Sequence, residues 1–543
     1  FRTDIGCAVQ GFEYNDRGEV CTKFYCGLEG ELVLRKDTGY AVEAYQDDEY
    51  GQRISVRYYD TKKQPVISAE DHCAGYDYEY DKEGNREYIK YIGLDGELMV
   101  RRDLGYAQVH FSYDSDGNIK EVEYFDKDKD ENGDYILTAR KERGYARYTN
   151  KYDENGNWKE SCYFGTDGAP VLRQDEGYFS IENEYDNEGR LISQKFYDIY
   201  DVDAVDDSEE KPLIISTKYC CAGFLYEYDD EFDNESDNIF GFTYEKNEKG
   251  VRKTTTYIGL NEEPVIRRDL GYAMVKSVYD LEDHEVSAVF CDEAGNVTFR
   301  KEGGYAAFRN KYENGKWVEG KYYGADGKPI LRKDTGYASI VNEYDEYGQR
   351  IKESYYNEYG ELTISTKYHC ACFKYQYDEA GNKTHVRYLD TKGKIMVLRD
   401  LGYAQVEIGY DSVGNKVSES YFDTKGKPAV WKEGGYASYV SEYENGKWME
   451  SRYYDKKGRP TKRNDEGYAV LKNTYDEYGQ RITQSYYDAA DQLKPVISTE
   501  HHCAGFQFEY DEKGNIVYVG YLGLDGNLMV RRDLGYAQMI MEY

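Results

Sequence analysis

The chain of 543 residues contains 63 tyrosines and 53 glycines but only 8 prolines, which is not the composition of ordinary globular domains and indicates a periodic structure. Its 104 acidic and 70 basic residues give a formal charge of -34, which repels phosphate backbones and anionic membrane surfaces at long range. We therefore expect no nucleic acid among its partners. No apolar run approaches the roughly 18 to 20 residues of a membrane helix, so we expect no membrane insertion in this segment.

Motifs built on Gly-Tyr-Ala recur along the whole chain and mark the starts of repeated units. The triplet begins at residues 39, 105, 144, 271, 304, 336, 402, 435, 467 and 535; its variants are GYF at 177, GCA at 6, and CAG or CAC before an aromatic residue near 75, 223, 372 and 505. From 402 onward the starts at 435, 467, 505 and 535 follow at intervals of 33, 32, 38 and 30 residues, each with its own spelling. The array of sixteen starts therefore repeats in fours.

The stretch "GYAQVEIGYDSVGNKVSESYFDTKGKP" from Gly402 shows what one unit contains. Before "YDSVG", Ala404, Val406 and Ile408 alternate with polar or aromatic neighbours, and a second alternation follows it from Val417 to Phe422. This period of two predicts a strand, a turn and a second strand. In the recurring "YDxxG" the Asp side chain can bond backbone amides two residues on, and Gly supplies a left-handed residue. We predict an all-β fold, an extended solenoid or superhelix of about sixteen stacked β-hairpin units of roughly 33 residues.

The spellings define four types of unit in chain order. First-type units follow "RRDLGYA" or its variant, second-type units follow Glu-Gly, Glu-Arg or Gly-Gly before Tyr-Ala, third-type units follow "DTGYA" or "DEGY", and fourth-type units follow "HCAG" or a variant. The predicted organisation is one continuous array with super-repeats at about 1–104, 105–270, 271–401 and 402–534, and another begins at 535. Because the first unit is second-type and the last is first-type, we expect a fragment of a longer array.

The tyrosine of Gly-Tyr-Ala is predicted to line the interior or the seam between successive hairpins. Gly before it allows close backbone approach, and Ala after it leaves room for a large neighbour. The prediction covers Tyr272, Tyr305, Tyr337, Tyr403 and Tyr436.

Small clusters of thiol and imidazole groups precede each fourth-type unit. They are His72 and Cys73; Cys220 and Cys221; His369, Cys370 and Cys372; and His501, His502 and Cys503. If the array coiled back once per four units, these groups could stack into a stripe that suits zinc or copper. The favoured alternative is a buried Cys that acts as a small hydrophobic residue. Eleven cysteines without paired spacing also argue against an obligatory disulfide framework.

An acidic insertion at residues 126–136 offers a calcium loop. Its "DKDENGDY" resembles the opening of an EF-hand or dockerin loop, with oxygen donors expected from Asp128, Asp130, Asn132 and Asp134. Ala139 stands where that family supplies a bidentate Glu, so any site should be weak, in the range of roughly 0.1 to 1 mM. The alternative is a merely solvated loop, as for the acidic insertions "DIYDVDAVDDSEEKP" and "YDDEFDNESDNIF".

The second strand of most second-type units opens with a tryptophan. The expected sugar-binding platforms consist of Trp158, Trp317 and Trp448 with the nearby Tyr163, Tyr322, Tyr323, Tyr453 and Tyr454. Such rings could stack on sugar faces or quaternary amines. The alternative is that each Trp packs between hairpins and stiffens the stack.

These aromatic hairpins carry a family resemblance. "NGKWVEGKYYGADGKPI" and "NGKWMESRYYDKKGRP" resemble the repeats of bacterial choline-binding and glucan-binding cell-surface modules. The recurring "YDxxGN" is similar to the YD repeats of secreted toxin shells and teneurin-type surface proteins. Both resemblances imply a bacterial, extracellular or cell-surface β-repeat protein.

Two functions of different class follow from these features. The first is multivalent, non-catalytic binding of cell-wall or host glycans through the aromatic hairpin faces. The alternative is a structural stalk, fibre or shell segment with no small ligand, including a YD-repeat toxin shell. Expected partners are glycans or neighbouring copies of the chain, and no cofactor is expected apart from the calcium weighed for the acidic loop. Since the sequence has no Gly-x-Ser-x-Gly elbow, phosphate-binding loop or His-Glu-x-x-His motif, we expect no enzyme.

Overall fold

A computed structural model of the protein describes residues 7, 9–15, 17–27, 30–35, 37–200, 202, 211–229, 251–490, 493–511 and 515–541. Within these ranges the regular structure is entirely β, which confirms the predicted fold class. The described ranges contain no helix long and apolar enough to cross a membrane. The predicted start at Gly6 and most of the acidic insertions, at 203–210 and 230–250, lie outside the described residues.

All the strands belong to one antiparallel sheet. They are β1 (Val9–Tyr14), β2 (Val20–Cys26), β3 (Val42–Asp47), β4 (Arg53–Tyr59), β5 (Gly75–Tyr80), β6 (Arg86–Ile92), β7 (Gln108–Tyr113), β8 (Ile119–Lys129), β9 (Tyr135–Leu137), β10 (Arg147–Tyr152), β11 (Trp158–Phe164), β12 (Ser180–Tyr185), β13 (Leu191–Tyr197), β14 (Gly223–Asp229), β15 (Arg252–Ile258), β16 (Met274–Tyr279), β17 (Glu285–Cys291), β18 (Ala307–Glu313), β19 (Lys316–Tyr323), β20 (Ser339–Tyr344), β21 (Arg350–Tyr356), β22 (Cys372–Tyr377), β23 (Lys383–Leu389), β24 (Gln405–Tyr410), β25 (Lys416–Phe422), β26 (Ser438–Glu444), β27 (Lys447–Tyr454), β28 (Val470–Tyr475), β29 (Arg481–Tyr487), β30 (Gly505–Tyr510), β31 (Ile516–Leu522) and β32 (Gln538–Ile540). Apart from the short β9, successive strands form hairpins, and β32 is the first strand of a last unit.

The hairpin β24–β25 shows how the sequence specifies its own turn. Its register is interrupted by a bulge between Gly409 and Tyr410. The Asp411 carboxylate accepts hydrogen bonds from the backbone amides of Val413 at 3.0 Å and Asn415 at 2.8 Å. Gly414 adopts a φ of 80° and closes the turn. The role predicted for "YDxxG" is therefore confirmed here.

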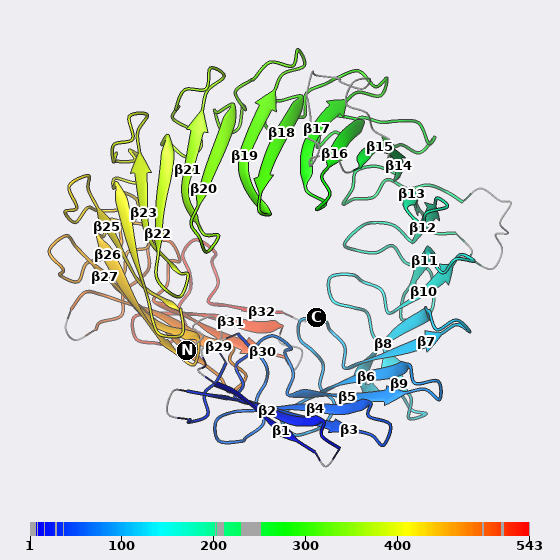
Figure 1. Cartoon of the computed structure of the whole chain (residues 1–543). Coiled ribbons are helices and arrows are strands. Elements are labelled where there is room, and N and C mark those ends of the chain that lie inside the picture. The colour runs from blue at the N-terminus through cyan, green and yellow to red at the C-terminus, as the bar shows by residue number, and fades with distance from the viewer. Residues whose placement is uncertain are drawn as a thin grey trace.

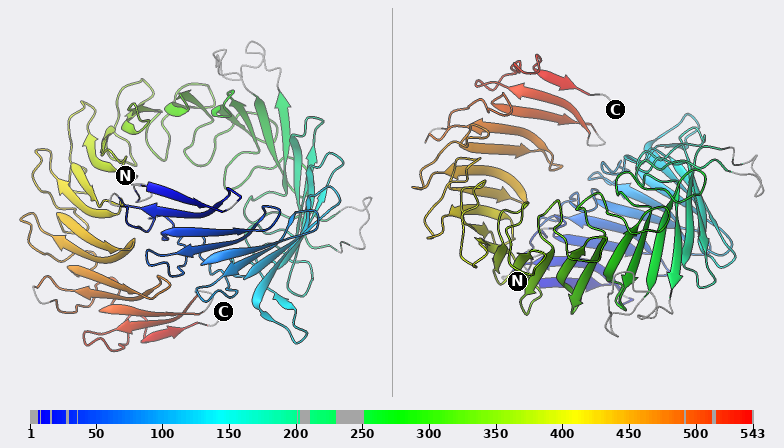
Figure 2. Two further views of the ribbon diagram at one scale, coloured as in Figure 1. Left: turned by 60° about the horizontal axis from the view of Figure 1, so that its bottom comes forward. Right: turned by 90° about the horizontal axis from the view of Figure 1, so that it is seen from above.

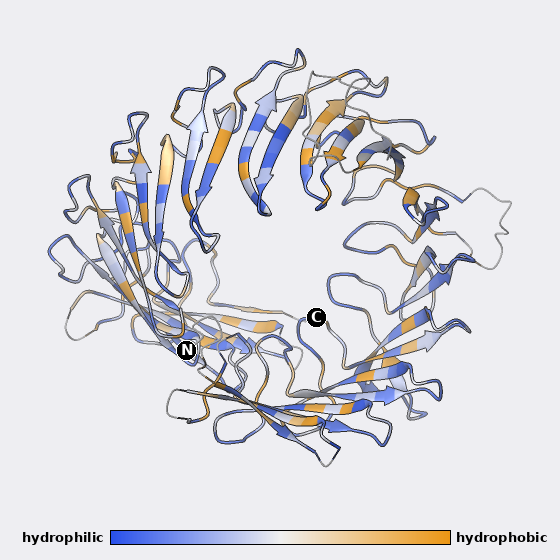
Figure 3. Ribbon diagram, viewed as in Figure 1, coloured by the Kyte–Doolittle hydropathy of each residue, from blue (hydrophilic) through white to orange (hydrophobic). Residues whose placement is uncertain are grey.

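Successive hairpins pair with each other through a short, shifted register. Between β25 and β26 the paired residues are Ser418 with Val440, Glu419 with Tyr439 and Ser420 with Ser438. The connecting loop forms one further bridge, from Phe422 to Pro428, where Pro ends the pairing. Every hairpin thus extends the same sheet. Along the strands apolar and polar residues alternate, as the hydropathy colouring shows (Figure 3).

The unit starts are more regular than the sequence motifs suggested. The backbone N–H of Gly39 donates to Arg35 O at 2.8 Å, and that of His72 donates to Ser68 O at 2.9 Å. Both residues have positive φ, 76° and 55° respectively, so His72 occupies the place of the glycine. The predicted start at Gly75 was therefore three residues late, as were those at 223, 372 and 505. Counted from 402, 435, 467, 502 and 535, the intervals become 33, 32, 35 and 33 residues.

The sheet curls into a superhelix around an open centre (Figure 1). The last strands pass beside the first ones, offset from them, as the side views show (Figure 2). Contacts join these turns: Lys141 Nζ donates to Asn515 Oδ1 at 2.7 Å, and the Arg102 guanidinium lies 5.0 Å from the Tyr478 ring centre. From the hairpin β7–β8 to β28–β29 there are ten hairpin steps, so the array does not coil back once per four units.

Candidate functional site

A row of aromatic rings, most of them buried, runs through the described part of the molecule, and we call it the aromatic ladder. Its rings belong to Tyr25, Tyr40, Tyr58, Tyr76, Tyr91, Tyr106, Tyr124, Tyr145, Tyr163, Tyr178, Phe196, Phe224, Tyr257, Tyr272, Phe290, Tyr305, Tyr322, Tyr337, Tyr355, Phe373, Tyr388, Tyr403, Tyr421, Tyr436, Tyr453, Tyr468, Tyr486, Phe506, Tyr521 and Tyr536. Consecutive ring centres lie between 4.5 Å and 6.4 Å apart, within the range of favourable aromatic pairs. The interior position predicted for the Gly-Tyr-Ala tyrosines is confirmed.

The residues around each ladder tyrosine explain the Gly-Tyr-Ala spelling. Gly402 has a φ of 84°, and a Cβ there would lie 2.9 Å from Val430 O. Ala404 is fully buried, its N–H donates to Phe422 O at 2.7 Å, and its carbonyl accepts from Tyr388 N at 3.2 Å. The alanine therefore joins its own hairpin to the preceding one, and its methyl group is enclosed by both.

Fourth-type units continue the ladder with an aromatic ring that comes three residues later in the sequence, while a cysteine takes the usual tyrosine position. Cys73 stands where other units have the ladder tyrosine, and the ring comes from Tyr76, three residues later, which contacts Tyr58 and Tyr91. A Cβ on Gly75 would lie 2.1 Å from Val56 O in this unit, whereas Cys372 occupies the same position in another fourth-type unit. The small buried thiol makes room for the displaced ring. This agrees with the predicted role of Cys73, Cys221, Cys370, Cys372 and Cys503 as small hydrophobic residues, whereas Cys220 is exposed.

An Arg-x-Asp motif in the connecting loops covers the ladder. In one copy, Arg332 Nε donates to Asp334 Oδ1 at 3.0 Å, and its guanidinium lies 4.6 Å from the Tyr322 ring centre. The same bidentate arrangement holds at Arg35, Arg101, Arg173, Arg267, Arg463 and Arg531. The cation faces the ring while Asp neutralises its charge. The sequence analysis missed this motif, although its recurrence before Gly-Tyr-Ala was the available signal.

Burial changes the acid–base properties of the ladder. It raises the pKa of Tyr163 to about 12, although the charge of Arg173 opposes the shift. Burial likewise raises the pKa of the Cys73 thiol to about 11. Neutral phenols and thiols are therefore the stable forms at neutral pH, and such thiols are poor metal ligands.

The three tryptophans occupy equivalent places but differ in packing. Trp317 and Trp448 pack against the main hydrophobic cluster, and a Cβ on Gly320 would lie 2.6 Å from the Trp317 ring. Trp158 is 36 % exposed, although both Trp158 and Trp448 have a serine in the place of Gly320, namely Ser161 and Ser451. The backbone carbonyl of each of these tryptophans accepts a hydrogen bond from the hydroxyl of a tyrosine in the next hairpin; for example, the Tyr344 hydroxyl donates to Trp317 O at 2.9 Å. The packing role proposed as the alternative agrees with the placement of Trp317 and Trp448.

The predicted platform tyrosines are divided between two environments. Tyr163, Tyr322 and Tyr453 are at most 6 % exposed and belong to the aromatic ladder, so neighbouring rings cover their faces. Tyr323 and Tyr454 are half-buried at the ends of their strands. The structure therefore does not assemble these tyrosines and tryptophans into exposed platforms, and glycan binding stays a prediction.

A groove of about 320 Å³ lies beside Trp158. Its lining includes Tyr148, Tyr152, Arg140 and Arg143. Arg140 is followed by Glu142 instead of the usual Asp, and no carboxylate among the described residues pairs with it. Its Nε is buried and has no hydrogen-bond partner there. This groove therefore combines a partly exposed indole with an unneutralised guanidinium.

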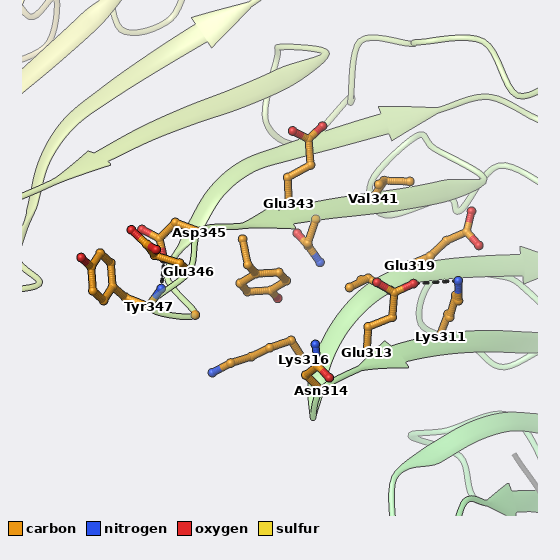
Figure 4. A pocket seen from close by; sticks show the side chains of 14 residues that line it. Lys311, Glu313, Asn314, Lys316, Glu319, Val341, Glu343, Asp345, Glu346 and Tyr347 are labelled. Carbon is orange, nitrogen blue, oxygen red and sulfur yellow. Dashed lines mark hydrogen bonds and ion pairs between the residues drawn. The ribbon is translucent and has the colours of Figure 1, made fainter. Parts of the chain in front are cut away.

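A larger groove, of about 910 Å³, lies between the turns of β18–β19 and β20–β21 (Figure 4). Carboxylates from Glu313, Glu319, Glu343 and Asp345 dominate its lining, with Lys311 beside Glu313 at 2.8 Å. None of the tryptophans lines it. The groove is a polar surface feature of the hairpin turns and offers no aromatic platform.

The thiol and imidazole clusters do not come together as a metal stripe. The described residues contain a single group of at least three potential ligands within 4.8 Å of one another, formed by Glu466, Glu500 and His501. Cys503 is fully buried and is not part of it. Since ten hairpins separate contacting turns, the copies of the cluster are spread around the superhelix.

The predicted calcium loop is the turn between β8 and β9. Asp130 Oδ1 accepts from the backbone amides of Asn132 at 2.8 Å and Asp134 at 3.0 Å, as in the other hairpin turns. Asp128 lies on β8 before the turn. The four predicted ligands are not gathered into a group of potential ligands in the described structure. Calcium binding stays a prediction, and the turn already satisfies its own amides without an ion.

Comparison with known proteins identifies no family. No protein-family model and no curated protein matches the chain. A crystal structure of TcdB2-TccC3 matches 94 % of this chain and 28 % of its own length, at 12 % identity and a TM-score of 0.23. A structure of the Photorhabdus luminescens Tc holotoxin pore matches 95 % of this chain and 27 % of its own length, at 11 % identity and a TM-score of 0.24. The chain thus spans little more than a quarter of either protein, and likeness at this level says nothing about function.

Proposed function

We propose that the chain is a structural wall segment, a stiff and curved β superhelix that serves as a scaffold or shell. The observation that carries this proposal is the aromatic ladder, which connects the hairpins from Tyr25 to Tyr536 without a missing contact. Each hairpin is too small to be stable alone and gains its stability from its neighbours. A ladder of large rings adds buried area and specific ring geometry at each junction.

The same observation weakens the reading of the chain as a multivalent glycan receptor. A ring binds a sugar through an open face, but the ladder rings have neighbouring rings, arginines or both against their faces. The abundant tyrosines therefore contribute to stiffness. The proposed wall is non-catalytic and extracellular, in agreement with the toxin shells and surface proteins whose YD repeats the sequence resembles.

Electron microscopy combined with a glycan array tests this proposal. We expect curved particles in micrographs and no saturable glycan binding by the wild type. Saturable binding that disappears in Trp317→Ala and Trp448→Ala would instead establish the tryptophan platforms. Globular particles without curvature would overturn the wall.

The groove beside Trp158 favours a second candidate function, binding of an anionic glycan. A uronate carboxylate would pair with Arg140, whose guanidinium has no carboxylate partner in the described structure, and the sugar face would stack on Trp158. Uronate-containing oligosaccharides on the same array test this function. Binding lost in Arg140→Gln but retained in Trp317→Ala supports it, whereas silence, or equal binding by Arg140→Gln and the wild type, refutes it.

A further inference from the structure

The curved sheet has two edges of different chemistry. We call the edge formed by the hairpin turns the tip rim, and the edge formed by the loops that connect hairpins the loop rim. Where the superhelix overlaps itself, the tip rim of the later turn lies against the loop rim of the earlier one. Tyr478 and Asn515 come from the tip rim, and their partners Arg102 and Lys141 come from the loop rim.

Both contacts join hairpins that are ten steps apart. Arg102 precedes β7–β8 and Tyr478 lies in the turn of β28–β29; Lys141 precedes β10–β11 and Asn515 lies in the turn of β30–β31. The unit types repeat every four hairpins, so a step of ten hairpins joins each unit type to the type that lies two further along the repeat. A third-type tip meets the loop before a first-type unit, and a fourth-type tip meets the loop before a second-type unit. The four-unit period is thus matched to the contact between turns.

The same contact residues recur on parts of both rims that no other part of the described structure covers. Tyr50 and Tyr347 occupy the position of Tyr478 in their own third-type turns and are 81 % and 80 % exposed, against 46 % for Tyr478. On the loop rim Arg268, Arg399 and Arg532 occupy the position of Arg102 and are exposed. The chain therefore has free copies of both halves of an interface that it already forms once.

We propose that these free rims bind a second copy of the chain, whose tip rim lies on the loop rim of the first. The spacing of the free residues fits this arrangement. Tyr50 and Tyr347 lie in the turns of β3–β4 and β20–β21, eight hairpins apart. Arg268 and Arg532 precede β16–β17 and β32, which are also eight hairpins apart. One placement of the second copy brings both tyrosines over both arginines.

Some loops of the loop rim are net basic, whereas three of the four third-type turns on the tip rim contain acidic and no basic residues. The third-type turns at 48–52, 345–349 and 476–480 each contain Asp and Glu and no basic residue. The loops at 390–402, 423–435 and 455–467 contain 3, 3 and 5 basic residues against 2, 2 and 3 acidic ones. Where two turns of the superhelix already meet, a groove of about 540 Å³ forms, with Leu94 and Met99 from the earlier superhelical turn and Phe508 from the later one. The existing contact therefore surrounds this apolar centre with the Arg102–Tyr478 and Lys141–Asn515 pairs, while its own loop at 93–105 contains 2 basic and 3 acidic residues.

Because a tip rim binds a loop rim, the interface is heterologous and leaves one free rim at each end of an assembly. Sedimentation velocity at about 0.15 M salt, which screens the net charge of each copy, measures this association. We expect wild-type chains to form assemblies longer than dimers as concentration rises. The variants are Tyr50→Ala/Tyr347→Ala on the tip rim and Arg268→Ala/Arg532→Ala on the loop rim. Both leave the internal contact between Arg102 and Tyr478 intact.

Loss of two exposed cation–π contacts should weaken association of either variant by about 5-fold to 30-fold. At concentrations where the intact contact forms and the weakened one does not, an equimolar mixture of the two variants should form heterodimers and nothing larger, since only one intact tip rim and one intact loop rim remain. The control is Tyr359→Ala, an equally exposed tyrosine, 84 % exposed, in a turn of the loop rim. Far-ultraviolet dichroism confirms that each variant is folded.

Two results would overturn the proposal: wild-type chains that stay monomeric at all concentrations, or tip-rim variants that associate like the wild type. The proposal rests on the wall function but is tested separately from it. Curved particles that remain monomeric would leave the wall intact and refute the rim contact.

Discussion

Replacement of Tyr403 by alanine tests whether the aromatic ladder stabilises the array. Tyr403 is 7 % exposed, and its ring centre lies 4.5 Å from that of Tyr421 and 6.0 Å from that of Tyr388. A buried aromatic side chain removes roughly 150 Å² or more from water, which at about 25 cal/mol per Å² corresponds to about 4 kcal/mol. Two lost ring contacts add to this cost, while residual burial in the unfolded chain reduces it. We therefore expect Tyr403→Ala to cost about 3 to 5 kcal/mol.

Denaturant unfolding and hydrogen exchange measure this cost in complementary ways. Since the hairpin that contains Tyr403 packs against the hairpins on either side of it, the loss should appear as faster exchange in β22 to β27, with little change in β3 to β6. Tyr359→Ala is the matched control, because its 84 % exposed ring should contribute less than about 0.5 kcal/mol. If the two variants unfold with the same free energy and exchange at the same rates, the ladder is not what stabilises the stack.

Four further predictions follow from named residues. Ala404→Leu should destabilise by about 1 to 3 kcal/mol in thermal unfolding, because the enclosed methyl site has no room for a larger side chain; an unchanged melting temperature would contradict that packing. His369→Gly should raise the free energy of unfolding by about 1 kcal/mol in denaturant unfolding, because His369 has a φ of 57° in a position that the other three unit types give to glycine. A loss of stability would indicate that the imidazole has a role of its own. In a spectrophotometric titration, ladder tyrosines such as Tyr163, whose pKa burial raises to about 12, should ionise only above the ordinary tyrosine pKa of about 10. The stability that comes from their neutral form is present below about pH 10 and is lost as the pH rises through 12, so complete ionisation of a folded chain at pH 10 would refute their burial. Burial opposes ionisation of Glu160, but Lys151 and Lys211 lower its pKa from 4.5 to about 2, so its contribution to stability is present above pH 4.5 and lost as the pH falls through 2; Glu160→Gln should flatten acid unfolding in this window, and an unaltered acid transition would contradict the ion pairs.

Most of the fold could be predicted from the sequence because the signals are local and repeated. Alternation of residue types predicts each strand, and "YDxxG" predicts each turn with a physical mechanism. The Gly-Tyr-Ala triplet correctly placed tyrosines such as Tyr337 in the interior. These features depend only on neighbours within one hairpin or the next.

Features that depend on the three-dimensional placement of residues from different positions were harder to predict. The motif at Gly75 matched the Gly-Tyr spelling, but the backbone shows that His72 takes the glycine position and Tyr76 supplies the ring. The Arg-x-Asp motif was visible in sequence, but its role required knowing that Arg332 lies over Tyr322. The number of hairpins per turn depends on small angles summed along the array, and no single residue encodes it.

The intervals between unit starts have a further consequence for how the chain can change in length. The steps from 105 to 144, from 177 to 220 and from 220 to 271 span 39, 43 and 51 residues, yet each still contributes one hairpin to the sheet. Residues added between strands leave the stacking of one superhelical turn on the next unchanged, because the ten-hairpin step between contacting segments depends on the number of hairpins and not on the number of residues. Addition or removal of a single hairpin would shift every later tip onto a loop of the wrong type. The molecule can therefore lengthen its loops freely, but on the overlapping turns it can change its number of hairpins without a mismatch only in multiples of four.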